Sequence, residues 1–227
     1  MANTEVGRTQ VNAQAGLLPT TKHRRGRRTA RQEAALASGS PFLVEAGSLA
    51  RLVTPGERWV LDIGFGTGEA VVAYAEADPE TFNLAVDMHT PGIGDLLASL
   101  DERGISNVRI VDADVRTVLA DMPSGCLAGV RTFFPDPWPK KRHHRRRLIN
   151  SEFARLLAER VQAGGTWHIA TDWPDYAEHI EAAVSVVPEW RGGRASRPAH
   201  RPQTRYERRG LVAGRTPIDL LFERTTG

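Results

Sequence analysis

The stretch Trp59–Gly68, with the sequence WVLDIGFGTG, decides the fold of this chain. Its first half, Trp59–Ile63, is apolar except for Asp62, which predicts a strand buried in a parallel sheet. The glycine-rich turn Gly64–Gly68 follows at once, and Glu69–Glu76 has the composition of a helix. A strand, a glycine turn and a helix in this order form the first unit of a doubly wound fold, and the glycines let backbone come close to a ligand.

Strands and helices alternate along the rest of the chain, which predicts an α/β, Rossmann-like doubly wound fold with a mostly parallel sheet. The expected strands are 59–64, 82–87, 108–112, 127–134, 166–170 and 218–223, and the expected helices are 69–76, 91–103, 115–122, 145–162 and 176–187. We expect the Arg- and Pro-rich segment 191–209 to be a long loop.

Length and composition exclude several classes of protein. A chain of 227 residues with 41% hydrophobic residues can bury one full core, and it has no apolar run of the length that a membrane-spanning helix needs. The first residues lack the apolar core of a signal peptide, so we expect a cytoplasmic protein. Cys126 is the only cysteine, which excludes disulfides and cysteine zinc sites within the chain.

Basic residues are concentrated in three segments, 22–31, 140–147 and 191–209. These 37 residues carry 19 of the 30 Lys and Arg residues but only one acid, Glu207, and the other 190 residues have a balance of −15. Such segregation is typical of a site for a polyanion on an otherwise acidic body. The alternative is three solvated loops that only aid solubility.

The first basic segment belongs to an N-terminal arm. We expect residues 1–35 to be a disordered basic arm and residues 36–227 to be a single domain. The Ala-rich stretch 31–39 can form a short helix that ends at Gly39. The arm is either a segment that becomes ordered on nucleic acid or a floppy tail.

Acidic residues stand at or just past the ends of four successive expected strands: Asp62, Asp87, Asp114 and Asp136. Ligands of an open α/β sheet bind in the crevice outside the carboxyl ends of its strands, so we expect these carboxylates to line one cleft. For Asp114 taken alone, the favoured interpretation is a structural one, the N-cap of the following helix or a solvated acid in the loop.

The glycine turn indicates which ligand this cleft takes. Its spacing is G-x-G-x-G followed by Glu69, which fits the dinucleotide fingerprint G-x-G-x-x-G poorly. Acids before and after the turn also disfavour a pyrophosphate and suit a ligand with hydroxyls and a positive centre, such as S-adenosylmethionine. No phosphate-binding G-x-x-x-x-G-K-[ST] motif occurs, and the adjacent His143 and His144 do not have metal-ligand spacing, so no metal is expected.

Several motifs together resemble known proteins. LDIGFGTGE is similar to the first motif of class I S-adenosylmethionine-dependent methyltransferases, which implies a seven-stranded sheet. FFPDPWPKKRHHRRRL, TDWPDYAEH and RPQTRYERRG with IDLLFER resemble the bacterial tRNA (guanine-N7-)-methyltransferase family, over about residues 24 to 224. The resemblance implies methyl transfer to N7 of the variable-loop guanine at position 46 of tRNA, by a monomer or homodimer that needs no protein partner.

The resemblance also implies roles for individual residues. The residues implied to contact S-adenosylmethionine are Asp62, Gly64, Gly66, Asp87, Asp114 and Asp136, and Asp136 also has the catalytic role. The residues implied to contact tRNA and its guanine are Lys140, Asp172, Thr204, Arg205, Tyr206 and Glu207. The chain departs from the family at Asp62 and Asp87, where Glu is frequent, at Arg205-Tyr206, where Lys-Phe is usual, and in 211–217, where a His-containing stretch is usual.

The reaction agrees with these residue types. Guanine N7 carries a free lone pair, so its methylation needs aligned reactants and carboxylates that balance charge rather than a base. Asp136 can accept a hydrogen bond from guanine N1–H or the amino group, while Trp138 either stacks on the base or wedges its loop. The alternatives are a nucleic-acid-binding module with a vestigial cofactor cleft, a dehydrogenase, which the glycine spacing disfavours, and a methyltransferase acting on another RNA or on protein.

Overall fold

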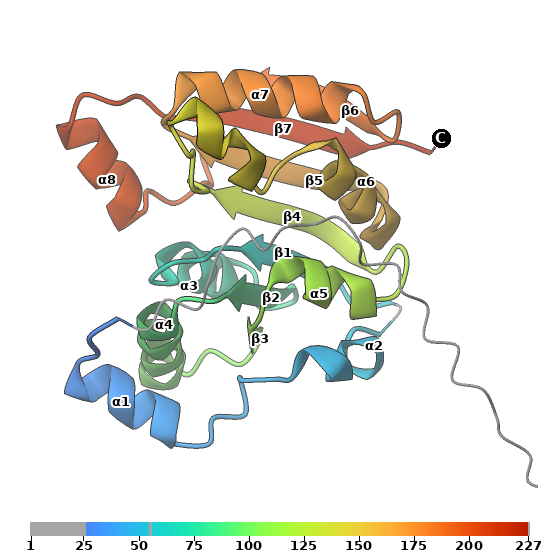
Figure 1. Ribbon diagram of the computed structural model, residues 1–227. Helices are drawn as coiled ribbons and strands as arrows, with labels where there is room; N and C mark the ends of the chain where they lie inside the picture. Colours follow the sequence, from blue (N-terminus) through green and yellow to red (C-terminus); the bar gives the residue numbers. More distant parts are fainter. Residues whose placement is uncertain (1–25, 55, 227) are drawn as a thin grey trace, which may run out of the picture.

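The computed structural model describes residues 26–54 and 56–226, and its centre is one seven-stranded sheet in the order β3-β2-β1-β4-β5-β7-β6 (Figure 1). The strands are β1 Trp59–Ile63, β2 Phe82–Asp87, β3 Val108–Asp112, β4 Leu127–Phe133, β5 Val161–Thr171, β6 Trp190–Ala195 and β7 Ile218–Arg224. β7 is antiparallel to both of its neighbours, and the other pairs are parallel. The predicted fold class is confirmed.

Helices cover both faces of the sheet, because the sheet contributes to two separate apolar cores. The helices are α1 Ala30–Ala37, η1 Ala46–Ser48, α2 Leu49–Leu52, α3 Glu69–Ala77, α4 Thr90–Arg103, α5 Val115–Asp121, η2 Lys141–Arg146, α6 Ser151–Arg160, α7 Pro174–Ser185 and α8 Arg205–Val212. One core joins the sheet to α2, α5, α6 and α7, and the other joins it to α1, α3 and α4. α8 projects from the edge of this body (Figure 1).

Strand β1 marks the point where the strand order reverses. β1 pairs with β2 on one side and with β4 on the other, so the connections from β1 and from β3 leave in opposite directions. In open α/β sheets the ligand crevice opens at this switch point. Asp62 lies beside Ala85 of β2 and Arg131 of β4 in the register, close to that crevice.

The turn after β1 packs against the start of α4 without room for a side chain. Gly66 and Gly68 have φ angles of 61° and 79°, in the left-handed region that favours glycine. A Cβ atom on Gly92 would lie 1.9 Å from the carbonyl oxygen of Gly66. The turn and α4 therefore fix each other's position through backbone contact.

The predicted helix 145–162 is wrong at both ends. The basic run instead forms the 3₁₀ helix η2, and α6 begins at Ser151, where the Asn150 side chain accepts a hydrogen bond from the backbone N–H of Phe153. Like charges one turn apart destabilise an α-helix, and Asn is a strong N-cap. The helix ends at Arg160, because the chain from Val161 onward pairs with β4 as a longer β5 than expected.

The segment 191–209, expected to be a loop, contains an edge strand and the start of a helix. Gly192 permits the pairing of β6 with β7, since a Cβ there would lie 2.1 Å from the carbonyl oxygen of Leu221. Thr204 caps α8 by accepting a hydrogen bond from the N–H of Glu207 at 3.2 Å. The abundance of Arg, Pro and Gly concealed both elements.

The structure also differs from the predicted limit of the N-terminal arm. Residues 1–25 lie outside the described residues, but α1 covers part of the segment expected to be disordered and packs on α4. Thr29 and Gln32 form a capping box, and Arg31 pairs with Glu102 at 2.8 Å. The capping box and this ion pair hold residues 30–35 in a helix, in agreement with the short helix predicted over 31–39.

Over the described part of the chain, no helix has both the length and the apolar character required to cross a membrane.

The contact between the glycine turn and α4 predicts the effect of adding one methyl group. Gly92→Ala should lower the free energy of unfolding by about 1–3 kcal/mol, because backbone cannot yield as a flexible side chain would. Chemical denaturation measures this loss. Gly47→Ala is the matched control, since a Cβ at Gly47 meets nothing within 4 Å. Equal stability of the two variants would contradict the close approach.

Candidate functional site

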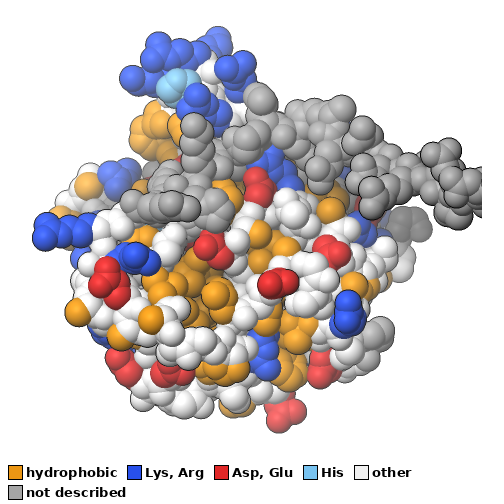
Figure 2. All heavy atoms as spheres, turned by 60° about the horizontal axis from the view of Figure 1, so that its bottom comes forward, with side chains coloured by type: hydrophobic (Ala, Val, Ile, Leu, Met, Phe, Trp, Pro, Cys, Tyr) orange, Lys and Arg blue, Asp and Glu red, His pale blue; other side chains and the backbone are white. Residues whose placement is uncertain are grey.

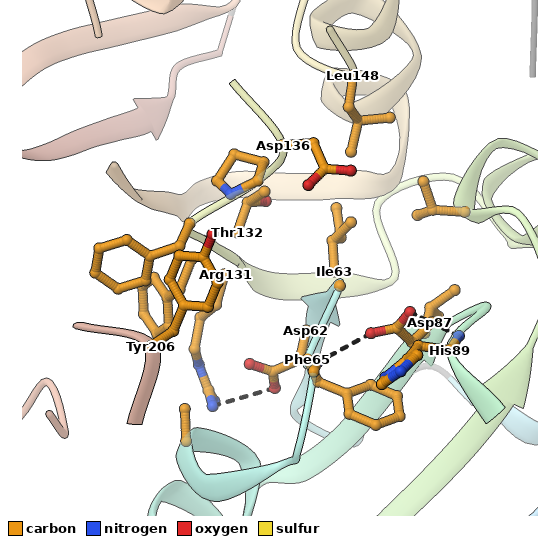
Figure 3. Close-up of a pocket in the computed structure, with 18 of the residues that line it drawn as sticks. Asp62, Ile63, Phe65, Asp87, His89, Arg131, Thr132, Asp136, Leu148 and Tyr206 are labelled. Carbon is orange, nitrogen blue, oxygen red and sulfur yellow. Dashed lines mark hydrogen bonds and ion pairs between the residues drawn. The ribbon is translucent and has the colours of Figure 1, made fainter. Parts of the chain in front are cut away.

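A cavity of about 470 Å³ opens at the carboxyl ends of β1, β2 and β4 (Figure 3). All four predicted acids line it, so the expectation that they share one cleft is confirmed. The predicted residues in its wall are Asp62, Gly64, Gly66, Asp87, Asp114, Asp136, Thr204, Arg205 and Tyr206. The cavity therefore lies between the glycine turn and the segment that leads into α8.

Asp87, the last residue of β2, holds the glycine turn that follows β1 in place. One carboxylate oxygen accepts hydrogen bonds from the N–H groups of Met88 and His89 at 2.7 and 3.0 Å, and the other accepts from Gly66 N–H at 2.9 Å. A carboxylate has about four acceptor positions, so this side chain retains acceptor capacity toward the cavity. Figure 3 shows Asp87 on the side of the cavity opposite Tyr206.

Asp62 forms a buried ion pair that the sequence did not predict. Its carboxylate is 3.2 Å from a guanidinium nitrogen of Arg131, which also donates to the side-chain oxygen of Asn83 at 3.0 Å (Figure 3). The guanidinium carbon lies 3.8 Å from the ring centre of Tyr74. Burial raises the pKa of Asp62, and Arg131 opposes that rise. The signal for this ion pair in the sequence was Arg131, the one charged residue of the largely apolar strand Leu127–Phe133.

Asp114 caps α5, which is one of the two interpretations favoured for this residue taken alone. Its side chain accepts from the backbone N–H of Arg116 at 3.0 Å and pairs with the Arg116 guanidinium at 2.7 Å. Burial alone would raise the pKa of Asp114, but these hydrogen bonds from Arg116 lower it. The carboxylate therefore remains charged at the rim of the cavity while it anchors its own helix.

Asp136 lies in a loop with unusual backbone geometry. Phe134 and Trp138, two residues to either side of it, have φ angles of 53° and 45°. Bulky residues rarely adopt positive φ, and each such residue costs about 1–3 kcal/mol, so surrounding contacts must hold the loop. In Figure 3 the Asp136 carboxylate points toward the end of β1 at Ile63.

The start of α8 forms another wall of the cavity. The ring of Tyr206 lies 5.9 Å from that of Phe134, and 56% of Tyr206 is exposed. Glu69 accepts a hydrogen bond from the Arg205 N–H at 2.6 Å and pairs with Arg208 at 3.1 Å. The first residue of α3 thus connects the glycine turn with α8, a role for Glu69 that the sequence did not predict.

Three of the residues expected to contact tRNA lie outside the cavity wall. Lys140 is exposed ahead of η2, and Asp172 accepts a hydrogen bond from Arg215 at 2.6 Å. Glu207 is only 3% exposed and accepts from the guanidinium of Arg201 at 2.7 and 2.8 Å. The structure thus gives Glu207 an internal partner and shows that the divergent segment 211–217 contributes Arg215 to the surroundings of Asp172.

Arg201 is the centre of a buried charged network. Its side chain is fully buried, and besides Glu207 it contacts Asp219 of β7, whose carboxylate oxygen lies 2.8 Å from Arg201 Nε. His168 of β5 lies 2.7 Å from the same oxygen of Asp219. The network joins the segment before α8 to two strands, so Arg201 does not belong to the exposed basic surface that the sequence predicted.

Most of the middle basic segment is exposed. The side chains that face solvent are Lys140, Lys141, Arg142, Arg145 and Arg146. Figure 2 shows a protruding group of Lys and Arg side chains with His among them. The Arg146 guanidinium carbon is 5.0 Å from the ring centre of Trp138, and both residues line the cavity. The predicted basic surface therefore begins at the mouth of the cavity.

Among the described residues, no group of three or more His, Cys, Asp or Glu side chains is arranged to hold a metal ion.

The order of the strands and the acids around the glycine turn define a class I methyltransferase. The structure aligns with an rRNA methylase of Streptococcus thermophilus with a TM-score of 0.53 over 80% of this chain and 95% of that one. At 12% identity, this likeness supports the fold alone.

The comparisons at the level of sequence are more specific. A family model described as "Putative methyltransferase" matches residues 57–220. A tRNA (guanine-N(7)-)-methyltransferase of Nitrosospira multiformis is 43% identical over 193 residues, which cover 83% of this chain and 84% of that protein. One of Streptomyces avermitilis is 48% identical over 171 residues, 73% of this chain but 59% of that protein. The chain belongs to the family of tRNA (guanine-N(7)-)-methyltransferases.

The buried network predicts a large loss of stability when Arg201 is removed. Arg201→Ala should lower the free energy of unfolding by about 3–5 kcal/mol, because Glu207 and Asp219 would stay buried without their cation. Thermal unfolding followed by circular dichroism measures the change. Arg191→Ala, at an exposed position of β6, should change stability by less than about 0.5 kcal/mol. A similar small effect at Arg201 would refute the role of the network.

Proposed function

We propose that this protein transfers the methyl group of S-adenosylmethionine to N7 of guanine 46 in the variable loop of tRNA. The observation that carries the proposal is one cavity that joins the glycine turn to the Asp136 loop and opens beside the exposed basic run. Membership in the family supports the same activity.

The residues of the cavity fit S-adenosylmethionine. A volume of about 470 Å³ is within the range of small-molecule sites, and the turn lines it with Gly64 and Gly66 as well as with Phe65 and Thr67. We propose that Asp87 accepts hydrogen bonds from the ribose hydroxyls of S-adenosylmethionine. Asp62, with Gly64 and Gly66, would hold its amino-acid end, and Asp114 would lie beside its adenine base. Asp62 already neutralises Arg131, so a ligand ammonium would add a second cation to a buried carboxylate.

Asp136 is proposed to orient the guanine. Its loop stands between the cofactor side of the cavity and the basic surface, and Tyr206 and Trp138 offer aromatic rings in the same wall. A carboxylate there can accept hydrogen bonds from guanine N1–H and the amino group. These hydrogen bonds would orient the base, so that N7 points in a fixed direction. Because N7 lies deep in the major groove of paired RNA, the base must be exposed or flipped.

The chemistry requires alignment and charge balance. When bound, S-adenosylmethionine supplies an electrophilic methyl group on sulfonium sulfur. The N7 lone pair forms the new bond as the sulfur–methyl bond breaks, and the positive charge passes to the guanine. No residue has to remove a proton, and the carboxylate of Asp136 offsets the charge that develops on the base.

The tRNA is proposed to lie over Lys140, Asp172 and the Thr204–Glu207 turn. Thr204, Arg205 and Tyr206 would contact the RNA directly, whereas Glu207 supports them from beneath through Arg201. We further propose that the enzyme acts in the cytoplasm, as a monomer or homodimer, with no metal and no obligate protein partner.

Methyl transfer is tested with labelled S-adenosylmethionine and unmodified tRNA. Nucleoside analysis should show 7-methylguanosine, and tRNA with adenine at position 46 should accept no label. Methyl on any other atom would refute the proposed function. Calorimetric titration with S-adenosylmethionine distinguishes a nucleic-acid-binding module, which would bind the donor weakly or not at all.

The role of Asp136 predicts a loss of turnover without a loss of binding. Asp136→Asn should lower kcat by about 10²–10³, because it removes a charge that acts on the transition state. The affinity for S-adenosylmethionine should change little, since the other three acids remain. Asp101→Asn, at an exposed position on α4, is the control. A near-normal rate for Asp136→Asn would show that this carboxylate is dispensable.

The basic surface predicts a specific change in salt dependence. The double variant with Ala at both Lys140 and Lys141 should bind tRNA more weakly. The fall of log K with log salt should also become less steep, by about 1.5. Replacing both with Arg should preserve the slope. Filter binding at several salt concentrations measures it, and an unchanged slope in the Ala variant would remove these lysines from the RNA interface.

A further inference from the structure

Arg147 differs from the other basic residues of its segment. Its side chain is 2% exposed, whereas Arg142, Arg145 and Arg146 are exposed. Arg147 therefore cannot reach an RNA phosphate without leaving its present position. The sequence gives no sign of this difference, because all of these residues stand in one run of Lys, Arg and His.

The contacts of Arg147 connect the Asp136 loop with α7. Its Nε donates a hydrogen bond to the carbonyl oxygen of Pro137 at 2.9 Å, and a terminal nitrogen pairs with the carboxylate of Asp175. The guanidinium carbon lies 4.9 Å from the ring centre of Tyr176, which is fully buried. One planar cation thus links the residue after Asp136 with the first turn of α7.

The loop around Asp136 needs such support. Pro135 and Pro137 have no N–H to donate, and Phe134 and Trp138 have positive φ angles. The Phe134 N–H donates to the carbonyl oxygen of Ala170 at 2.7 Å, which holds the loop where it leaves β4. The bond from Arg147 to Pro137 holds it on the other side of Asp136.

We propose that Arg147 is a positioning residue that fixes the loop carrying Asp136, while its exposed neighbours hold the RNA. The inference rests on the proposed function for its kinetic effect, but the support of the loop is a property of the protein alone. Lys at position 147 would keep the charge but could not donate in two directions from one plane, so the geometry of the guanidinium is the feature under test.

The kinetic test compares Arg147→Lys with Arg145→Ala in the full chain. Arg147→Lys should lower kcat at saturating tRNA at least tenfold, with the Kd for tRNA and its salt slope within twofold of the wild type. Arg145→Ala should do the reverse, raising Kd and lowering the salt slope while kcat is retained. Arg51→Lys, on α2, controls for the chemical change itself. A variant of Arg147 that loses RNA affinity and keeps kcat would overturn the proposal.

A second measurement does not depend on catalysis. Hydrogen exchange at the amides of Asp136 and Trp138 should be at least threefold faster in Arg147→Lys than in the wild type, and unchanged in Arg51→Lys. Unaltered exchange at both amides would overturn the proposal even if turnover falls. If the wild type makes no 7-methylguanosine, the proposed function fails while this measurement still decides the role of Arg147.

Asp175→Asn provides a milder variant in case Arg147→Lys does not fold. The Asp175 side chain is 59% exposed, so its replacement leaves the bond from Arg147 to Pro137 in place. The same changes in kcat and exchange are expected, in the same direction but smaller. If Arg147→Lys does not fold, wild-type kcat and wild-type exchange in Asp175→Asn would overturn the proposal.

Discussion

The carboxylate of Asp87 is the constraint on which the geometry of the cavity depends. Three backbone N–H groups, from two segments, converge on it, and one belongs to the glycine turn. The same turn touches α4 at Gly92 with no space for a methyl group. This one carboxylate therefore ties the turn after β1 to the end of β2, where the strand order reverses. The other acids of the cavity take their positions relative to this fixed edge.

Arginine serves two purposes in this molecule: some arginines join segments inside it, and others form its exposed basic surface. Arg131, Arg147 and Arg201 are inside and pair with acids or carbonyl oxygens, whereas the arginines of η2 are outside. A buried guanidinium is well suited to join several segments, because it donates in fixed directions within one plane. The loop with Asp136 and the start of α8, which face the same cavity, are each held by one such arginine. Basic composition alone is therefore a poor measure of the proposed RNA-binding surface.

The sequence predicted six of the seven strands of the sheet, the glycine turn and the convergence of the four acids, because these follow from local patterns and from the rule for ligand sites in α/β sheets. It did not predict α8, β6 or the division of the basic run. Arg147 and Arg201 look like surface residues until Asp175 and Asp219, far along the chain, are brought beside them. The length of α6 was missed for the same reason: the apolar stripe continues into residues that pair with β4 instead.

The placement of β7 has a consequence for synthesis of the chain. β7 follows α8 in the sequence but lies between β5 and β6, so β6 has no neighbour in the sheet until β7 is inserted. Asp219, which anchors the segment before α8 through Arg201, arrives with the same strand. A nascent chain on the ribosome can thus build the half of the cavity formed by β1 and β2 early, while the wall that contains Tyr206 is completed last. The growing protein remains without the finished face proposed to bind RNA until residues up to Arg224 have left the exit tunnel.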